Sequence, residues 1–171
     1  AKPGVTLQGV TAAGAPITSA AAVATTIDYA ATNSFGSSGF FVEADHVTIR
    51  GVGIGVQTVD YTNKTIEVIG DDFTLRDCVV GDDEGSVYFD DWRATMSTSW
   101  VQSYHVLDNV FTDGNSVDVA SGPGVSGPVS GRVISGNVFT MSDIYNSISF
   151  NGTTPAVGWF VYPVGGAVIT G

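Results

Sequence analysis

The chain has 171 residues, 22 of them Gly, and a formal net charge of -11 from 17 acidic and 6 basic residues. Its 25 Val and 10 Ile against only 3 Leu favour strands over helices, and 43% hydrophobic residues suffice for a buried core within one domain. Six basic residues are too few to neutralise a phosphate backbone, so we expect no nucleic-acid partner. No apolar run reaches the ~18 residues of a transmembrane segment.

In chain order, residues 5–10 predict a first strand, and an Ala-, Thr- and Ser-rich stretch follows over residues 12–38. Residues 19–24 within this stretch predict either one helical turn or a further strand. Short apolar runs followed by turn residues predict three more strands, at residues 40–42, 66–69 and 159–162. Residues 82–99 interrupt the pattern and predict a protruding loop, and residues 121–128 predict an irregular connection.

An eight-residue motif recurs at residues 47–54, 73–80, 104–111 and 132–139, with partial copies at 5–10 and 167–171. Each full copy has an aliphatic residue at its third place, Gly or Asp at its fifth and an apolar residue at its eighth. The third places are Leu7, Ile49, Leu75, Val106, Ile134 and Ile169, spaced by 42, 26, 31, 28 and 35 residues. A strand, a corner and a second strand at such intervals predict the turns of a β-solenoid, with the third and eighth places inward and a bend at the fifth.

These copies resemble the repeats of right-handed parallel β-helix proteins, the family that includes pectate lyases, polygalacturonases and phage tailspikes. Residues 106–111 and 134–139 carry the resemblance best. It implies an all-β fold, a single right-handed parallel β-helix of about six rungs over residues 1–171. It also implies that Asn109 and Asn137 stack as corner asparagines. The ladder is expected to be partial, because Val52 and Cys78 hold that place in the other copies.

Acidic residues concentrate within 21 residues, at Asp71, Asp72, Asp82, Asp83, Glu84, Asp90 and Asp91. Three interpretations are open: solvated turns, a calcium site and a catalytic site. The calcium candidates are Asp82, Asp83, Glu84, Asp113, Asn115 and Asp118. The catalytic candidates are Asp82, Asp83, Asp90 and Asp91, with Trp92 as a platform for a sugar ring. Calcium is the one cofactor that the pattern leaves open.

Basic residues and cysteine add little chemistry to this pattern. Arg50 and Arg76 share one motif place, so we expect them to stack outward on adjacent turns, where they either balance nearby Asp or bind a uronate carboxylate. The two histidines, His46 and His105, lie at no zinc spacing. Cys78 is expected to be a small buried residue. The chain has Asp-Asp steps but lacks the Gly-His-Gly and Arg-Ile-Lys segments that accompany them in polygalacturonases.

The sequence starts inside one motif copy and stops inside another, without the polar cap expected of a solenoid end. We therefore expect either a fragment of a longer solenoid or a unit that stacks end to end with copies of itself. The resulting prediction is a non-catalytic structural protein, secreted or at the cell surface, that assembles head to tail into extracellular filaments. The alternatives are a polysaccharide hydrolase or lyase of the β-helix class, and a phage or adhesin module that binds glycans.

Overall fold

The computed structural model describes residues 4–30, 38–57, 64–81, 86–90, 101, 103–112, 116–121, 131–140, 148–153, 159–160 and 168–170. These residues contain no α-helix and a single short 3-10 helix, η1 (Ala20–Ala22), whose N-cap Ser19 accepts a hydrogen bond from the amide of Ala21. The helical turn is one of the two structures predicted for residues 19–24. None of the described helical structure has the length and apolarity that crossing a bilayer requires.

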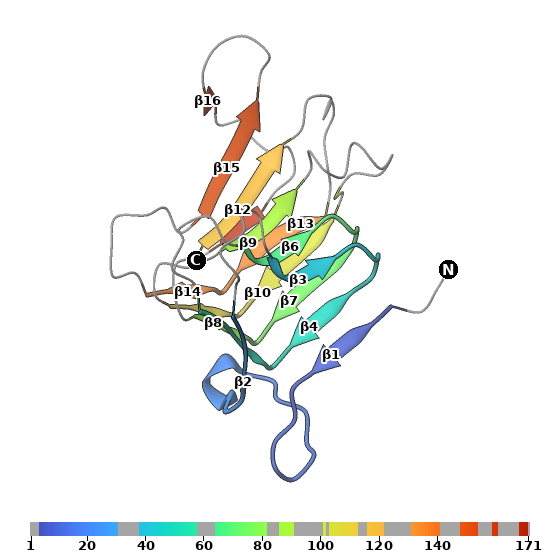
Figure 1. Ribbon diagram of the computed structural model, residues 1–171, viewed down its shortest axis with the longest axis vertical. Coiled ribbons are helices and arrows are strands. Elements are labelled where there is room, and N and C mark those ends of the chain that lie inside the picture. The colour runs from blue at the N-terminus through green and yellow to red at the C-terminus, as the bar shows by residue number, and fades with distance from the viewer. Residues whose placement is uncertain are drawn as a thin grey trace.

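The described strands form three sheets, and successive turns of the chain add strands to each of them in order (Figure 1). The first sheet contains β1 (Thr6–Gln8), β4 (Thr48–Arg50), β7 (Phe73–Arg76), β10 (Tyr104–Leu107), β13 (Arg132–Ser135) and β17 (Val168–Thr170). The second sheet contains β2 (Thr26–Ala30), β5 (Gly53–Gln57), β8 (Val79–Gly81), β11 (Val110–Phe111) and β14 (Val138–Phe139). The third sheet contains β3 (Ser38–Val42), β6 (Lys64–Val68), β9 (Ser86–Asp90), β12 (Ser116–Ser121), β15 (Ile148–Thr153) and β16 (Trp159–Phe160).

The predicted repeat is confirmed by the register of the first sheet. All six third-place residues pair in one column, from Leu7 through Ile49, Leu75, Val106 and Ile134 to Ile169. The four from Ile49 to Ile134 are at most 2% exposed. Strands of the first and second sheets are parallel throughout, an arrangement compatible with a β-solenoid.

The bend at the fifth place is also confirmed, because Gly51, Asp77, Asp108 and Gly136 all have positive φ, at 64°, 55°, 55° and 67°. Glycine adopts this left-handed conformation without a Cβ clash, and aspartate is among the few other residues that tolerate it. The corner takes the chain from the first sheet to the second, where the eighth-place residues Ile54, Val80 and Phe111 are fully buried.

The hydrophobic core lies between the sheets and is filled by side chains from all three. Phe89 of the third sheet stacks on Tyr104 of the first, with 3.9 Å between ring centroids, and Phe111 stacks on Phe139 within the second at 4.7 Å. β-Branched residues occupy most other core places, which accounts for the excess of Val and Ile over Leu.

The repeat is broken at the far end of the third sheet. The strand predicted at residues 159–162 is described as β16, but it pairs antiparallel with β15. Only residues 154–158 separate the two strands. A connection this short joins antiparallel neighbours, whereas a parallel crossover needs about a dozen residues or more.

Candidate functional site

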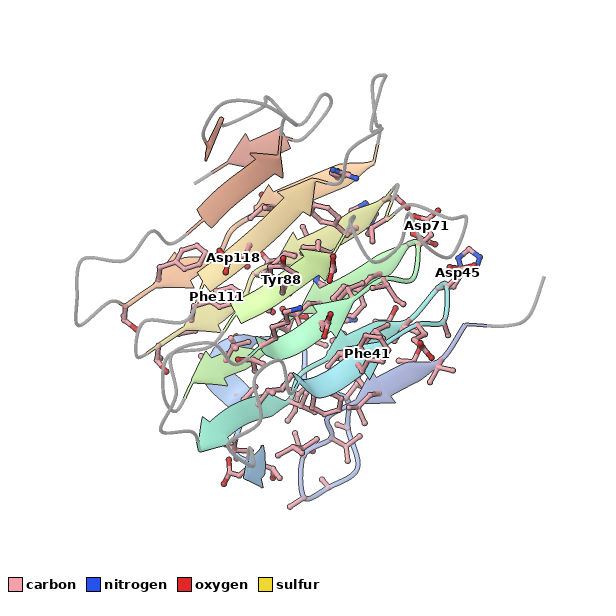
Figure 2. All side chains as sticks on the ribbon, turned by 45° about the horizontal axis from the view of Figure 1, so that its top comes forward. Phe41, Asp45, Asp71, Tyr88, Phe111 and Asp118 are labelled. Carbon is pink, nitrogen blue, oxygen red and sulfur yellow. The ribbon has the colours of Figure 1, made fainter. Side chains whose placement is uncertain are left out.

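The acidic candidate Asp90 lies on the outer face of the third sheet, at the end of β9. The prediction of a protruding loop over residues 82–99 is wrong for residues 86–90, because these form β9 between β6 and β12. Core-facing residues alternate along these strands, so the residues between them point away from the core. One outward column runs from Phe41 through Glu67 and Tyr88 to Asp118, in the register of β3, β6, β9 and β12. Figure 2 shows Phe41, Tyr88 and Asp118 on these neighbouring strands.

Four side chains on this face form a charged cluster: Lys64, Glu67, Tyr88 and Asp90. The Lys64 Nζ donates to Glu67 Oε1 at 2.8 Å and lies 3.7 Å from Asp90 Oδ2. The same ammonium sits 4.0 Å from the centroid of the Tyr88 ring. Lys64 therefore joins both carboxylates and one aromatic face across β6 and β9.

The charged cluster is largely closed to solvent. Glu67 is 1% exposed and Asp90 8%, although both lie on the outer side of the sheet. A carboxylate loses its hydration on burial and requires a charged or hydrogen-bonding partner in return, which Lys64 supplies here. Glu67 is too buried for direct contact with a polymeric substrate, and the pair of Lys64 and Asp90 joins β6 to β9.

The other sequence candidates divide into two groups. Asp118 is among the described residues. It lies on β12, where it pairs in register with Tyr88 of β9, the strand that also carries Asp90. The remaining acidic, amide and tryptophan candidates lie outside the described residues, namely Asp82, Asp83, Glu84, Asp91, Trp92, Asp113 and Asn115. Within the described part of the chain, no three His, Cys, Asp or Glu side chains gather in a way that would hold a metal ion.

Arg50 and Arg76 stack in direct register on β4 and β7, as expected. The Arg50 Nε donates to Asp77 Oδ2 at 2.8 Å, and the Arg76 Nε lies 3.4 Å from the same oxygen. Arg76 also reaches Asp108 on the following turn, with 3.2 Å between Nη2 and Oδ2. Both arginines thus form ion pairs with the fifth-place aspartates, of which Asp77 is only 3% exposed. Binding of a uronate by the two arginines stays a prediction.

An exposed corner, formed by Asp45, His46, Asp71, Asp72 and Ser103, leads from the third sheet into the first. The amide of Asp71 donates to Asp45 Oδ1 at 2.8 Å, and Asp71 Oδ1 accepts from the amide of Ser103 at 2.7 Å (Figure 2 labels both aspartates). His46 Nδ1 lies 2.7 Å from Asp72 Oδ2. The pKa of His46 is raised, chiefly by this hydrogen bond to Asp72; desolvation opposes the shift, and the charges of Asp72, Asp45 and Asp71 add to it.

A buried corner, formed by Val52, Cys78, Asn109 and Asn137, leads from the first sheet into the second. Asn109 Oδ1 accepts from the amide of Cys78 at 2.9 Å, and Asn109 Nδ2 donates to the carbonyl of Leu75 at 3.1 Å. Asn137 repeats both contacts one turn later, from the Asn109 amide at 3.0 Å and to the Val106 carbonyl at 2.8 Å. The partial asparagine ladder is confirmed.

Cys78 takes the place of a third asparagine in this ladder. Its Sγ lies 3.7 Å from the carbonyl of Ile49, the third-place residue of the preceding turn, to which an asparagine amide would donate. Burial raises the pKa of the Cys78 thiol to about 11. The thiol is therefore protonated at neutral pH. Cys78 is fully buried, as expected from the sequence.

Lys64 and Glu67 were missed as site residues. The signal was available in part, because Glu67 interrupts the apolar run at residues 66–69 and strand alternation places it on the outer face. Its burial and its pairing with Asp90 of the next turn depend on contacts between segments that are distant in the sequence.

Comparison of the chain with protein-family models, with curated proteins and with solved structures gives no match.

Proposed function

We propose that this chain is a non-catalytic structural protein, secreted or exposed at the cell surface, whose turns form a single right-handed parallel β-helix that assembles end to end into filaments. The in-register columns and the asparagine ladder support the β-helix, since both repeat once per turn. The low density of charge, 13% of residues, together with abundant Gly, Ser and Thr, supports an extracellular or surface location.

One observation carries the non-catalytic assignment: charged side chains of the described turns are paired with those of neighbouring turns. Arg50 pairs with Asp77, Arg76 with Asp108 and His46 with Asp72, over separations of 27, 32 and 26 residues. The pair of Lys64 and Asp90 likewise joins adjacent strands. Catalysis by carboxylates requires one group held protonated and one ionised beside a substrate, whereas these groups are matched with cations and hold the stack together.

The decisive experiment is incubation of the whole chain with a panel of acidic and neutral polysaccharides, with and without calcium. We expect no new reducing ends and no unsaturated products. Products that disappear in the Asp90→Asn or Asp91→Asn variants, and persist in the control Asp45→Asn on the exposed corner, would contradict the proposal and identify a carbohydrate-active enzyme.

A second candidate function is glycan binding without cleavage. It is favoured by Tyr88, a half-buried ring on the outer face of the third sheet with Asp118 beside it in register. Aromatic faces flanked by carboxylates suit pyranose rings, which present an apolar face and a hydroxyl rim. Binding on a glycan array that is lost in Tyr88→Ala, with no turnover in the polysaccharide panel, would identify this function.

A further inference from the structure

The charged cluster on the third sheet contains Lys64, the one lysine in the described part of the chain. The ion pairs at the corners use Arg50, Arg76 and His46 instead. A guanidinium stays protonated in proteins and an acylated imidazole is hydrolysed by water, whereas the amine of a lysine forms a stable amide with a carboxyl group. The charged cluster therefore holds a pair of groups that can be joined covalently, and the corner pairs do not.

The ammonium of Lys64 contacts a carboxylate on each of two strands. Its Nζ donates to Glu67 Oε1 on β6 at 2.8 Å and lies 3.7 Å from Asp90 Oδ2 on β9. Reacting atoms in a near-attack arrangement are about 3–3.5 Å apart, so a small shift of the lysine side chain brings Nζ to the carboxyl carbon of Asp90. Glu67 is thus placed to accept a proton from Nζ, and Asp90 is placed to accept the amine as an electrophile.

The surroundings of the pair favour a neutral product over two ions. Glu67 and Asp90 are buried, and the side chain of Lys64 is only 21% exposed. The ring of Tyr88, which Figure 2 labels, has its centroid 4.0 Å from Nζ and covers the ammonium. Burial costs each ion its hydration, and condensation of an amine with a carboxylate replaces two ions by one neutral amide. The same shielding keeps water away from the amide and so slows its hydrolysis.

We propose that Lys64 and Asp90 condense into an isopeptide bond that joins β6 to β9 covalently. Glu67 takes a proton from the ammonium, the freed lone pair of Nζ attacks Asp90 Cγ, and Glu67 returns the proton to a carboxylate oxygen. The bond from Cγ to that oxygen then breaks, and a second proton passes from Nζ through Glu67 to the departing oxygen, which leaves as water. One of the three ammonium protons stays on the amide nitrogen. The step needs no oxidant, and Glu67 ends in the protonation state in which it began.

The isopeptide bond closes a covalent loop over residues 64–90, between neighbouring strands of the third sheet. A closed loop lowers the conformational entropy of the unfolded chain, as a disulfide does. Cys78 is the single cysteine, so no disulfide can form within the chain, and the amide supplies a covalent link of the same kind. The bond forms once per chain without turnover. It is compatible with the proposed structural function but does not depend on it.

The test is the intact mass of the whole chain, measured in denaturant after the folded protein has been incubated at neutral pH. We expect a mass below that of the sequence by one water molecule and, after proteolysis, a branched peptide that joins Lys64 to Asp90. Lys64→Arg keeps the positive charge but forms no amide, so it should have the full mass. Glu67→Gln keeps the shape of the side chain but accepts no proton, so the bond should form at least about 100-fold more slowly. The control Asp45→Asn, at the exposed corner, should lose water as the native chain does.

A native chain with the full mass of its sequence would overturn the proposal and leave Lys64 as an ion-pair partner only. A loss of water that persists in Lys64→Arg would also overturn it, because the water would then come from another site, such as a cyclised aspartate. A branched peptide at Glu67 instead of Asp90 would overturn the assigned bond. The mass and the peptide map of the native chain decide even where a variant fails to fold. Polysaccharide turnover and filament formation test the proposed function separately, since a chain without the bond can still form filaments.

Discussion

The exposed corner and the buried corner solve one problem in two ways. Both turn the chain sharply through residues of positive φ, His46 and Asp72 in the first and the fifth-place residues in the second. Both also link each turn to the next by hydrogen bonds that backbone amides donate to side-chain oxygens. The exposed corner uses carboxylates and a histidine in contact with water, and the buried corner uses neutral amides and one thiol.

The difference indicates which corner governs stability. Bonds between charged groups in water are screened and replaceable, so their net contribution is small. A buried amide leaves its backbone partners unsatisfied when it is removed, and that cost is paid in full because no water replaces it. We therefore expect the buried corner to make the larger contribution to the free energy of unfolding and the exposed corner to make a smaller one.

The largest effect is expected from Asn109→Ala in the buried corner. The substitution leaves the amide of Cys78 and the carbonyl of Leu75 without the hydrogen bonds that they form with the Asn109 side chain. At about 1–3 kcal/mol for each buried unsatisfied group, we expect a loss of about 3 kcal/mol in the free energy of unfolding. Urea denaturation measures it. Asn137→Ala, at a half-buried site, is the control and should cost less than half as much. Equal losses would mean that burial does not set the strength of the ladder.

The next effect concerns Gly51, which has a φ of 64° and would place a Cβ 2.8 Å from the Cβ of Ile17. Gly51→Ala combines a left-handed conformation, which costs about 1–2 kcal/mol, with this clash, so we expect a loss of about 3 kcal/mol or slightly less. Gly14→Ala is a matched control, because Gly14 also has a positive φ, at 82°, but open space around its Cβ. Thermal unfolding of the two variants separates strain from clash, and a Gly14→Ala variant that is equally unstable would remove the clash from the account.

Cys78→Asn should extend the ladder by one turn. The new Oδ1 would accept from the amide of Val52 and the new Nδ2 would donate to the carbonyl of Ile49, as Asn109 does one turn later. We expect a gain of about 1 kcal/mol, the net value of a hydrogen bond in a protein. Cys78→Ala, which only removes the thiol, should lose stability under the same urea titration. A loss of stability with both variants would contradict this expectation and show that the Cys78 site does not accommodate an asparagine.

The smallest effect is expected at the exposed corner and depends on pH. The pKa of His46 is raised in the folded protein by its hydrogen bond to Asp72. The folded state therefore binds the proton more tightly, and the resulting stability is present in full below the ordinary histidine pKa of about 6.5 and is lost as the pH rises through the raised value. The urea midpoint of the native chain should fall slightly from pH 6 to pH 9. Asp72→Asn should flatten this slope, and an unchanged slope would exclude the pair as its cause.

Much of this architecture could be predicted from the sequence because the repeat is periodic. The column from Leu7 to Ile169 and the bend at the fifth place follow from residue types at fixed spacing. The burial of Glu67 and the antiparallel pairing of β16 do not follow, because the first depends on contacts between distant segments and the second on a short connection that replaces a crossover. Arg132 shows the same limit. It lies opposite Tyr104 in the register of β10 and β13 and is fully buried, although a charged residue is expected at the surface.

The most direct test of end-to-end assembly by stacked turns is electron microscopy of the purified chain, with fibre diffraction of the same sample. The account predicts filaments with a reflection at about 4.7–4.9 Å along the filament axis, the spacing of strands that stack in that direction. Isolated particles of the native chain at every concentration, or filaments whose strand spacing lies across the axis, would contradict it.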